Sequence, residues 1–434
     1  MDGERTRRIE VGTLARVEGE GALTLRVRGD RLLDVQLRIY EPPRFFEALL
    51  RGRDFREAPD ISARICGICP IAYQLGAAQA MEDACGVQVG AGLRALRRLI
   101  YCGEWIESHA LHVFLLHLPD FLGMPDAVAL AEAGHRDTVQ AALRIRKLGN
   151  ALMRVIGGRE IHPVNLKVGG FWRAPDAEAL QALLPDIGQA TDAMLRQLDQ
   201  LTRLAFPDFT VDCEFLALRH DEEYAITEGR LVSSRGIDLP LEGYDGLLTE
   251  THVRHSTALQ SQRSDGGTPV HVGPLARLHL NRDRLPPELA RLAGQIGLEP
   301  GCRNPFKSIL ARVIEVLYAL GEARRLIDGY RVPEAPAIDC PPRAGTGYGA
   351  TEAPRGLCYH RYTLAADGVI TDAKIVAPTS VNQRQIEADL HEYAASRLDQ
   401  SDERLRHGCE RLIRSYDPCI SCSTHFLTLN IENG

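Results

Sequence analysis

Two pairs of cysteines with the same C-x-x-C spacing lie near opposite ends of this 434-residue chain. Cys66 and Cys69 belong to the stretch R-I-C-G-I-C-P, and Cys419 and Cys422 belong to D-P-C-I-S-C-S-T-H. Two cysteines at this spacing can bind one ion, and the entropy of closing a chain loop grows only logarithmically with its length. The four sulfurs therefore predict a fold that brings both ends of the chain to one metal site.

Composition excludes several other classes of protein. Charged residues make up 25% of the chain and the formal net charge is -7, so there is no basic footprint for nucleic acid. We find no apolar run of the roughly eighteen residues that a membrane span needs, and the polar opening MDGERTRRIE does not resemble a signal peptide. We therefore expect a cytoplasmic protein whose eleven cysteines serve as metal ligands or packing residues rather than as a disulfide framework.

Local patterns predict the surroundings of the first cysteine pair. Alternating apolar and polar residues over 9–40 predict a β-hairpin with its turn at Gly29-Asp30. Proline near the start and glycine near the end predict short helices over 43–52 and 70–85. The cysteine pair then lies in a loop that enters a helix.

The rest of the chain predicts a single domain over 1–434, α+β but mainly α, with a central bundle of long helices and peripheral antiparallel β-structure. The bundle helices, which have apolar residues at three- and four-residue spacing, are expected over 91–118, 126–156, 176–204 and 304–328. A mixed α+β lobe is expected over 207–285 and strands over 357–376. Helices should flank Asp399, and the last of them leads into an irregular metal-binding arm over 417–425.

Spacing alone leaves the identity of the metal open, because two C-x-x-C pairs also form closed structural zinc sites. The flanking residues argue for a different site. Asp417 and His425 accompany the second pair and are not needed by structural zinc, while Arg64 and a helix start beside the first pair favour thiolate over thiol. Soft thiolates also suit nickel and iron.

The two cysteine motifs resemble those of the large subunit of nickel–iron hydrogenases. Further motifs of that family match in order along nearly the whole chain: R-V-E-G at 16–19, R-F-F-E at 44–47, G-R-E-I-H-P at 158–163, E-A-P-R-G at 352–356 and A-P-T-S-V-N at 377–382. The resemblance implies the large-subunit fold and a catalytic subunit that cleaves and forms dihydrogen heterolytically. Electrons would pass through a partner iron–sulfur subunit.

The resemblance also implies how the metals are held. Cys66 and Cys419 would be the terminal nickel ligands, and Cys69 and Cys422 would bridge nickel to an iron that carries cyanide and carbon monoxide. Four further residues match positions that bind the other parts of the metal centre in the family. Pro354 and Thr379 match positions that contact the cyanides, and Glu47 and His425 match ligands of a magnesium-type ion. Without the resemblance, Thr379 would be a turn residue and Glu47 an exposed helix residue.

Four residues match catalytic positions of the family. Glu18 matches the proton-relay carboxylate, and Arg355 matches a guanidinium that lies over the open metal position. Asp120 and Asp417 match carboxylates that orient this arginine. Read alone, Glu18 would be a surface glutamate after a strand and Asp120 a turn residue at a helix end. We exclude three histidines from the ligands, because their spacing and apolar neighbours predict a core helix with satisfied imidazoles. They are His109, His112 and His117.

Departures from the family pattern indicate a branch. Many members have histidines where this chain has Glu20 and Tyr73, which favours the cytoplasmic branch over the membrane-linked uptake branch. That branch implies a delta-type iron–sulfur small subunit and flavin-bearing diaphorase subunits that exchange electrons with NAD(P), although deazaflavin and polysulfide stay open as partners. Residues 426–434 follow the histidine after which a maturation endopeptidase often cuts, so the chain is expected to be a precursor.

Two other classes of function stay open from the sequence. A non-catalytic relative of the quinone-module subunit of respiratory complex I would share the fold but typically lacks the cysteine pairs. A zinc-stapled interaction scaffold would bind zinc and no nickel. Retention of all four cysteines argues against the first, and the flanking residues argue against the second.

Overall fold

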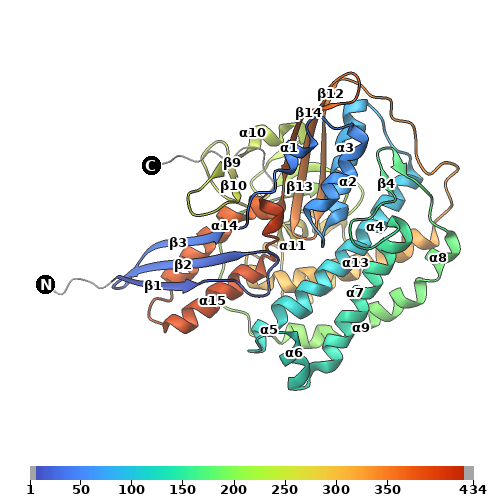
Figure 1. The fold of residues 1–434 in the computed structure, drawn as a ribbon. Helices are drawn as coiled ribbons and strands as arrows, with labels where there is room; N and C mark the ends of the chain where they lie inside the picture. The colour runs from blue at the N-terminus through green and yellow to red at the C-terminus, as the bar shows by residue number, and fades with distance from the viewer. Residues whose placement is uncertain (1–5, 425–434) are drawn as a thin grey trace.

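The computed structural model describes residues 6–424 of the chain. The predicted hairpin is confirmed, because β2 (Gly21–Arg28) and β3 (Arg31–Ile39) pair antiparallel around a turn at Gly29-Asp30. A third strand, β1 (Thr6–Val11), pairs with β2 and was not predicted. The sheet projects from one side of the molecule beside α14 and α15 (Figure 1). Residues 12–20, which contain Glu18, lie between its first two strands.

The segment before the bundle contains three helices. The helix expected over 43–52 is only α1 (Phe46–Leu50), and α2 (Ala58–Ser62) follows it. The next helix, α3 (Pro70–Cys85), has the predicted bounds: proline occupies its first turn and Gly86 ends it in the left-handed conformation. Cys69 caps the start of α3, so the cysteine pair does lie in a loop that enters a helix.

The bundle consists of shorter helices than predicted. The expected helix over 91–118 is α4 (Ala91–Ala110), a π-helical segment (Leu111–His117) and α5 (Leu118–Phe121). The next is broken at Gly134, with φ of 100°, into α6 (Ala127–Leu130), a second π-helical segment (Ala131–His135) and α7 (Arg136–Gly157). The third is α8 (Ala177–Gln181) and α9 (Leu184–Thr202), which restarts with a proline in its first turn, and the fourth is α13 (Ser308–Asp328).

The mixed α+β lobe expected over 207–285 lies beside the bundle, and its sheet is not wholly antiparallel. Its four-stranded sheet has the order β11-β6-β7-β8, and β11 pairs parallel to β6. The long connection over 220–269 makes a parallel pair possible, because it is long enough to cross over. The strands of the lobe and of the short hairpins around it are β4 (Leu166–Lys167), β5 (Gly170–Phe171), β6 (Glu214–Arg219), β7 (Arg230–Ser233), β8 (Asp238–Leu239), β9 (Leu248–His252), β10 (Leu259–Arg263) and β11 (Val270–His271). Its helices are α10 (Tyr244–Leu247), α11 (Pro274–Asn281) and α12 (Pro287–Gln295).

The C-terminal part forms an antiparallel sheet of β12 (Gly345–Ala353), β13 (Gly356–Leu364) and β14 (Ile370–Val376). The glycine-rich β12 was not predicted as a strand. Its glycines serve close packing, since a Cβ on Gly347 would lie 2.0 Å from the Ala80 carbonyl oxygen of α3. The two helices expected around Asp399 are α14 (Pro378–Ala395) and α15 (Asp402–Ser415).

The largest apolar core extends from the N-terminal sheet through the bundle helices to the C-terminal cysteines. Helix α3 packs on β12 and β13 on one side of this core, while α4 packs against α7 and α13 on the other (Figure 1). Within residues 6–424, none of the helices combines the length and apolarity that crossing a membrane requires.

Candidate metal centre

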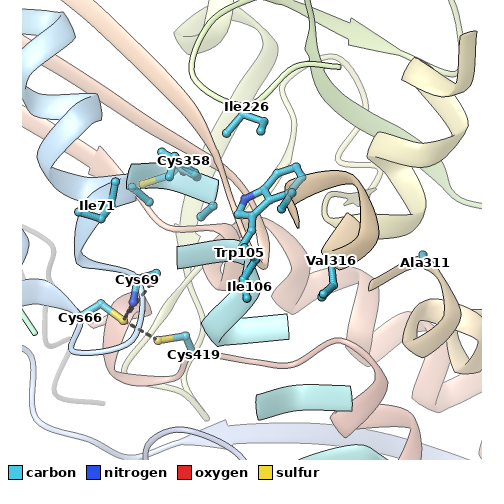
Figure 2. Close-up of a cluster of buried hydrophobic side chains, with 14 of the residues drawn as sticks. Cys66, Cys69, Ile71, Trp105, Ile106, Ile226, Ala311, Val316, Cys358 and Cys419 are labelled. Carbon is cyan, nitrogen blue, oxygen red and sulfur yellow. Dashed lines mark hydrogen bonds between the residues drawn. The ribbon is translucent and has the colours of Figure 1, made fainter. Parts of the chain in front are cut away.

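The four predicted cysteine ligands lie together inside the core. The Sγ atoms of Cys66, Cys69, Cys419 and Cys422 all lie within 4.8 Å of one another, and all four residues are buried. The Cys66 and Cys419 sulfurs, from opposite ends of the chain, are 3.5 Å apart. Figure 2 shows these two side chains pointing toward each other, with Cys69 beside them. Among the described residues this is the group of metal-ligating side chains that can surround one site.

Local backbone structure aims each sulfur at the others. A 3-10 turn (Ala63–Ile65) ends at Cys66, whose Sγ then accepts the backbone amides of Ile68 at 3.4 Å and Cys69 at 3.2 Å. On the other arm, Asp417 adopts a left-handed backbone conformation after α15, and this turns the chain inward. The Cys419 amide donates to the Thr379 hydroxyl at 2.9 Å, which holds the arm against the start of α14.

The C-terminal arm also lies against the loop that contains Glu18. The Ile420 amide donates to the Glu18 carbonyl oxygen at 3.0 Å, and the Ser421 amide donates to the Glu18 carboxylate at 3.1 Å. Gly19 has φ of 88°, and a Cβ there would lie 2.7 Å from the Ile420 Cβ. The glycine of the R-V-E-G motif therefore permits the close approach of the two segments.

Arg44 joins the two cysteine arms, a role that the sequence did not reveal. Its Nη2 donates to the carbonyl oxygen of Ile65 at 2.8 Å and also to that of Ser421. Its backbone amide donates to the Thr424 carbonyl oxygen at 2.7 Å. One guanidinium thus binds the residue before Cys66 and the residue before Cys422. The R-F-F-E motif contains this arginine, but only the folded chain shows which carbonyl groups it meets.

Arg355 is the cation of the site, and it contacts Asp417. Its Nε donates to the Asp417 carbonyl oxygen at 2.7 Å and its Nη2 donates to the carboxylate at 3.1 Å. Although burial opposes it, Asp417 and the cysteine charges raise the pKa of Arg355 well above its usual range. The Arg355 Nη1 and Asp417 Oδ2 atoms have no hydrogen-bond partner among the described residues. Buried unpaired polar atoms of this kind indicate that a further group belongs in the site.

Arg64 does not contribute to the site, contrary to the prediction from its place next to the first pair. Its side chain is exposed and forms an ion pair with Asp60, 2.9 Å away. Although burial acts against it, hydrogen bonds from the other cysteines and the charge of Arg355 lower the pKa of Cys66 well below its usual range. Burial raises the pKa values of Cys419 and Cys422. A metal that binds all four sulfurs must therefore displace protons from the site.

The donor set fits a nickel–iron pair. Four thiolates in a buried pocket are soft ligands, which nickel and iron accept, and a fixed guanidinium lies beside them. The family model described as nickel-dependent hydrogenase matches residues 44–151 and 264–425, which together exceed half of the chain and include both cysteine pairs. The chain belongs to the nickel-dependent hydrogenase family.

Individual relatives agree with this assignment. The chain is 34% identical over 425 residues to sulfhydrogenase 2 subunit alpha of Pyrococcus furiosus, covering 97% of this chain and 100% of that one. It is 27% identical to the NAD-reducing hydrogenase HoxS subunit beta of Cupriavidus necator, covering 97% and 95%. A crystal structure of an NAD+-reducing [NiFe]-hydrogenase in the H2-reduced state matches with a TM-score of 0.89 at 26% identity, covering 96% and 99%. The chain is thus a catalytic hydrogenase large subunit, an oxidoreductase with the mainly helical α+β fold of that family.

The structure pairs Asp120, which was predicted to orient Arg355, with two other arginines, so its orienting role stays a prediction. The Asp120 carboxylate accepts Nε and Nη2 of Arg414 at 2.7 and 2.8 Å, and it also accepts Nη2 of Arg16. Arg16 lies two residues before Glu18, and Arg414 lies three residues before Asp417. Asp120 therefore connects the Glu18 loop to the end of α15. A motif match placed it near the site, but its two partners come from distant parts of the chain.

We expect the Asp120→Asn variant to lower the free energy of unfolding by about 3–5 kcal/mol, because Arg414 stays buried without its anion. Thermal and chemical denaturation measure this loss. Asp221→Asn, which changes an exposed carboxylate, should stay within about 0.5 kcal/mol of the unmodified subunit. A variant as stable as the unmodified protein but with reduced turnover would instead support an orienting role for Asp120.

The other predicted site residues surround the cluster at different depths. Glu18 is half-buried and its carboxylate faces the cysteine arm through Ser421, so it is not the surface residue that a reading without the motif suggests. Thr379 is buried, and its hydroxyl oxygen accepts the Cys419 amide. Pro354 has no amide hydrogen, and its carbonyl oxygen accepts Nη2 of Arg277 at 2.9 Å. Hydrogen-bond donation to cyanide at this position would have to come from Arg355, its neighbour.

Glu47 is buried rather than exposed, and its Oε1 accepts the Ile375 amide at 2.7 Å. His425, its predicted partner in binding a magnesium-type ion, lies outside the described residues. A second carboxylate that no motif marks lies within electrostatic reach. Burial raises the pKa of Glu250 to about 8, with Lys374 opposing and Glu47 contributing. The magnesium site stays a prediction, with Glu250 as an added candidate.

The three histidines left out of the ligand set do lie in the core. Nε2 of His109 is 3.0 Å from Glu315, and Nε2 of His112 is 2.7 Å from the Arg414 carbonyl oxygen. Burial lowers the pKa of His109 to about 4. The expectation of satisfied imidazoles is wrong for His117, because neither ring nitrogen has a hydrogen-bond partner among the described residues. Its ring instead packs 4.9 Å from that of Phe121.

Asp389, on α14 behind the cysteine arm, should make stability depend on pH. Burial raises its pKa to about 7, although the Tyr416 hydroxyl and Gln385 donate to it. Folding therefore favours the protonated form of Asp389. The stability that this form contributes is lost as pH rises from the pKa of the unfolded chain, near 3.9, through the pKa of the folded chain, about 7. In that window the free energy of unfolding of the unmodified protein should fall by about 1.4 kcal/mol per pH unit relative to that of Asp389→Asn.

Melting temperatures measured at several pH values test this prediction for Asp389. Glu403→Gln, which replaces an exposed glutamate on the neighbouring helix α15, is the control and should follow the unmodified protein at every pH. A constant difference in melting temperature between Asp389→Asn and the unmodified protein across the series would contradict the raised pKa.

Proposed function

We propose that this subunit splits and forms dihydrogen at a nickel–iron pair held by its four cysteines, and that a partner iron–sulfur subunit exchanges the electrons with NAD(P). The observation that carries the proposal is the cluster of four buried sulfurs within 4.8 Å, beside an arginine with a free Nη1. Relatives named as an NAD-reducing hydrogenase subunit and as sulfhydrogenase subunits support the electron route.

In this proposal Cys66 and Cys419 would hold nickel, and Cys69 and Cys422 would hold both nickel and an iron that carries cyanide and carbon monoxide. The metal pair supplies the redox chemistry that separates dihydrogen into protons and electrons. Arg355, a permanent cation fixed by Asp417, provides positive charge and an unpaired donor beside the four cysteines.

Surrounding residues complete the proposed site. The Glu18 carboxylate, held at the Ser421 amide, moves protons away from the cysteine arm. Thr379 and the Pro354-Arg355 segment contact the cyanides, and Glu47 with His425 binds a magnesium-type ion. In this scheme the chain works in the cytoplasm with a small iron–sulfur subunit and flavin-bearing diaphorase subunits, after a maturation endopeptidase removes the tail beyond His425.

An infrared spectrum of the purified complex tests the proposal, because metal-bound cyanide and carbon monoxide absorb where protein does not. We expect such bands together with one nickel and one iron per chain by elemental analysis. Mass spectrometry first establishes that the tail has been removed. Matured protein that contains one zinc, no nickel and no diatomic bands would overturn the proposal and favour a zinc-stapled scaffold.

A further inference from the structure

Two carboxyl groups on α4 are buried and take no part in the proposed chemistry. Glu104 has no exposed surface and Glu107 is 3% exposed. They are three residues apart on one helix, so their side chains project from the same face. Glu104 Oε1 and Glu107 Oε2 have no hydrogen-bond partner among the described residues. Buried carboxyl groups with an unused oxygen are uncommon and require an explanation.

Glu104 is the inner member of the pair. Its Oε2 accepts the Ile71 amide at 2.7 Å, in the first turn of α3 and two residues beyond Cys69. Figure 2 shows Ile71 above the cysteine loop, on the same side as α4. Burial raises the pKa of Glu104 well above its usual range, despite the hydrogen bond from Ile71. Burial therefore favours the protonated, uncharged form of this carboxyl group.

Glu107 is the outer member and connects to the surface. Its Oε1 accepts Nε of Arg146 at 2.7 Å, from the neighbouring helix α7. Glu107 and Arg146 line a hollow of about 350 Å³ that is open to solvent. Gly67 and Ile68, from the loop between Cys66 and Cys69, line the same hollow. The hollow thus brings water to Glu107 on the Cys66 side of the cluster, whereas Glu18 lies on the side of the C-terminal arm.

We propose that Glu104 and Glu107 form a second proton route, which joins the Cys66 side of the cluster to water in the hollow. The proposal rests on the proposed hydrogenase function. Glu104 gives its carboxyl proton to the free Oε2 of Glu107, so one O–H bond breaks and another forms. Glu107 passes this proton to water, and Glu104 regains a proton from the cluster side. No electron moves in these steps, and the operation in reverse supplies protons for dihydrogen formation.

The first test follows the Glu104 proton itself and does not depend on activity. The infrared difference between the unmodified complex and Glu104→Gln isolates the carbonyl stretch of the protonated Glu104 carboxyl, and transfer into D2O shifts this band as its proton exchanges. We expect Glu107→Gln to slow that exchange by about 100-fold, the scale of one proton-transfer group. Glu132→Gln, an exposed glutamate, should leave the rate unchanged. Equal exchange rates in Glu107→Gln and the unmodified complex would overturn the route.

The second test compares turnover in combined variants. If both routes operate, Glu18→Gln/Glu104→Gln should lose about 100-fold more activity than Glu18→Gln alone. Adding Glu107→Gln to Glu104→Gln should cost nothing further, because both residues serve one route. Cyanide and carbon monoxide bands must persist in every variant. If the bands persist and the Glu18/Glu104 double variant turns over as fast as Glu18→Gln, the second route is overturned. If the unmodified complex has no such bands, the proposed function itself is overturned.

Discussion

The Cys419→Ser variant should lose its nickel, and its hydrogen-dependent activity should fall by more than about 10⁴-fold. A loss of this size is possible because enzymes commonly accelerate their reactions by about 10⁶-fold or more. Cys419 lies 3.5 Å from Cys66 and holds the C-terminal arm in the cluster. A serine hydroxyl is a hard, protonated ligand that does not replace a soft thiolate on nickel. Elemental analysis and hydrogen-dependent reduction of an artificial acceptor measure the two losses.

Cys302→Ser is the matched control for the cysteine replacement. Cys302 is partly buried and borders a separate hollow beside α11, so its replacement should leave nickel content and activity unchanged. Loss of nickel from both variants would mean that cysteine replacement simply destabilises the chain. Full nickel content and turnover in Cys419→Ser would contradict the four-sulfur site.

The Arg355→Lys variant should keep its metals but lose about 10²–10³-fold in turnover, the usual cost of removing one fixed electrostatic group from an active site. Lysine keeps the positive charge but loses the planar fork. The single nitrogen of lysine cannot replace three separate nitrogens, of which Nε and Nη2 of Arg355 donate to the Asp417 carbonyl oxygen and carboxylate while Nη1 has no partner among the described residues. Turnover per nickel, with infrared bands as the check on the metal pair, measures the effect.

Arg64→Lys is the matched control for the arginine. Arg64 lies two residues before Cys66 in the chain, yet its side chain is exposed and pairs with Asp60. Exposed pairs of this kind contribute little, so turnover should not change. Equal losses in the two variants would mean that any arginine near the first cysteine pair matters. Unchanged turnover in fully metallated Arg355→Lys would remove Arg355 from the mechanism.

The position of Asp120 indicates how the two arms stay aligned. Its carboxylate binds Arg16 near the Glu18 loop and Arg414 near the C-terminal arm, and Arg44 binds both cysteine arms directly. Four charged side chains thus join segments that meet only in the folded chain. Such buried ion pairs cost desolvation energy, but breaking one leaves an unpaired charge in the core. Their value here is the alignment of the sulfurs.

Short-range patterns predicted the parts of this protein that depend on neighbouring residues. The C-x-x-C spacing marked the four sulfurs, and proline and glycine placed α3 at its observed bounds. Alternation predicted the β2–β3 hairpin, because its turn joins adjacent strands. The order of family motifs predicted the contact between Asp417 and Arg355, which the structure contains. The division into a single domain stays a prediction.

Contacts between distant segments could not be read in the same way. Arg64 is adjacent to the first cysteine pair but faces solvent, while Arg44 and Asp120 meet partners hundreds of residues away. The glycine-rich stretch of β12 was not predicted as a strand, because its glycines serve the close approach of α3 rather than a sequence pattern. Spacing along the chain determines which side chains share a turn or a face, and so it named the ligands. Only packing in three dimensions determines which charged side chains become neighbours. The tertiary structure therefore decided which groups hold Arg355 and which groups join the two cysteine arms.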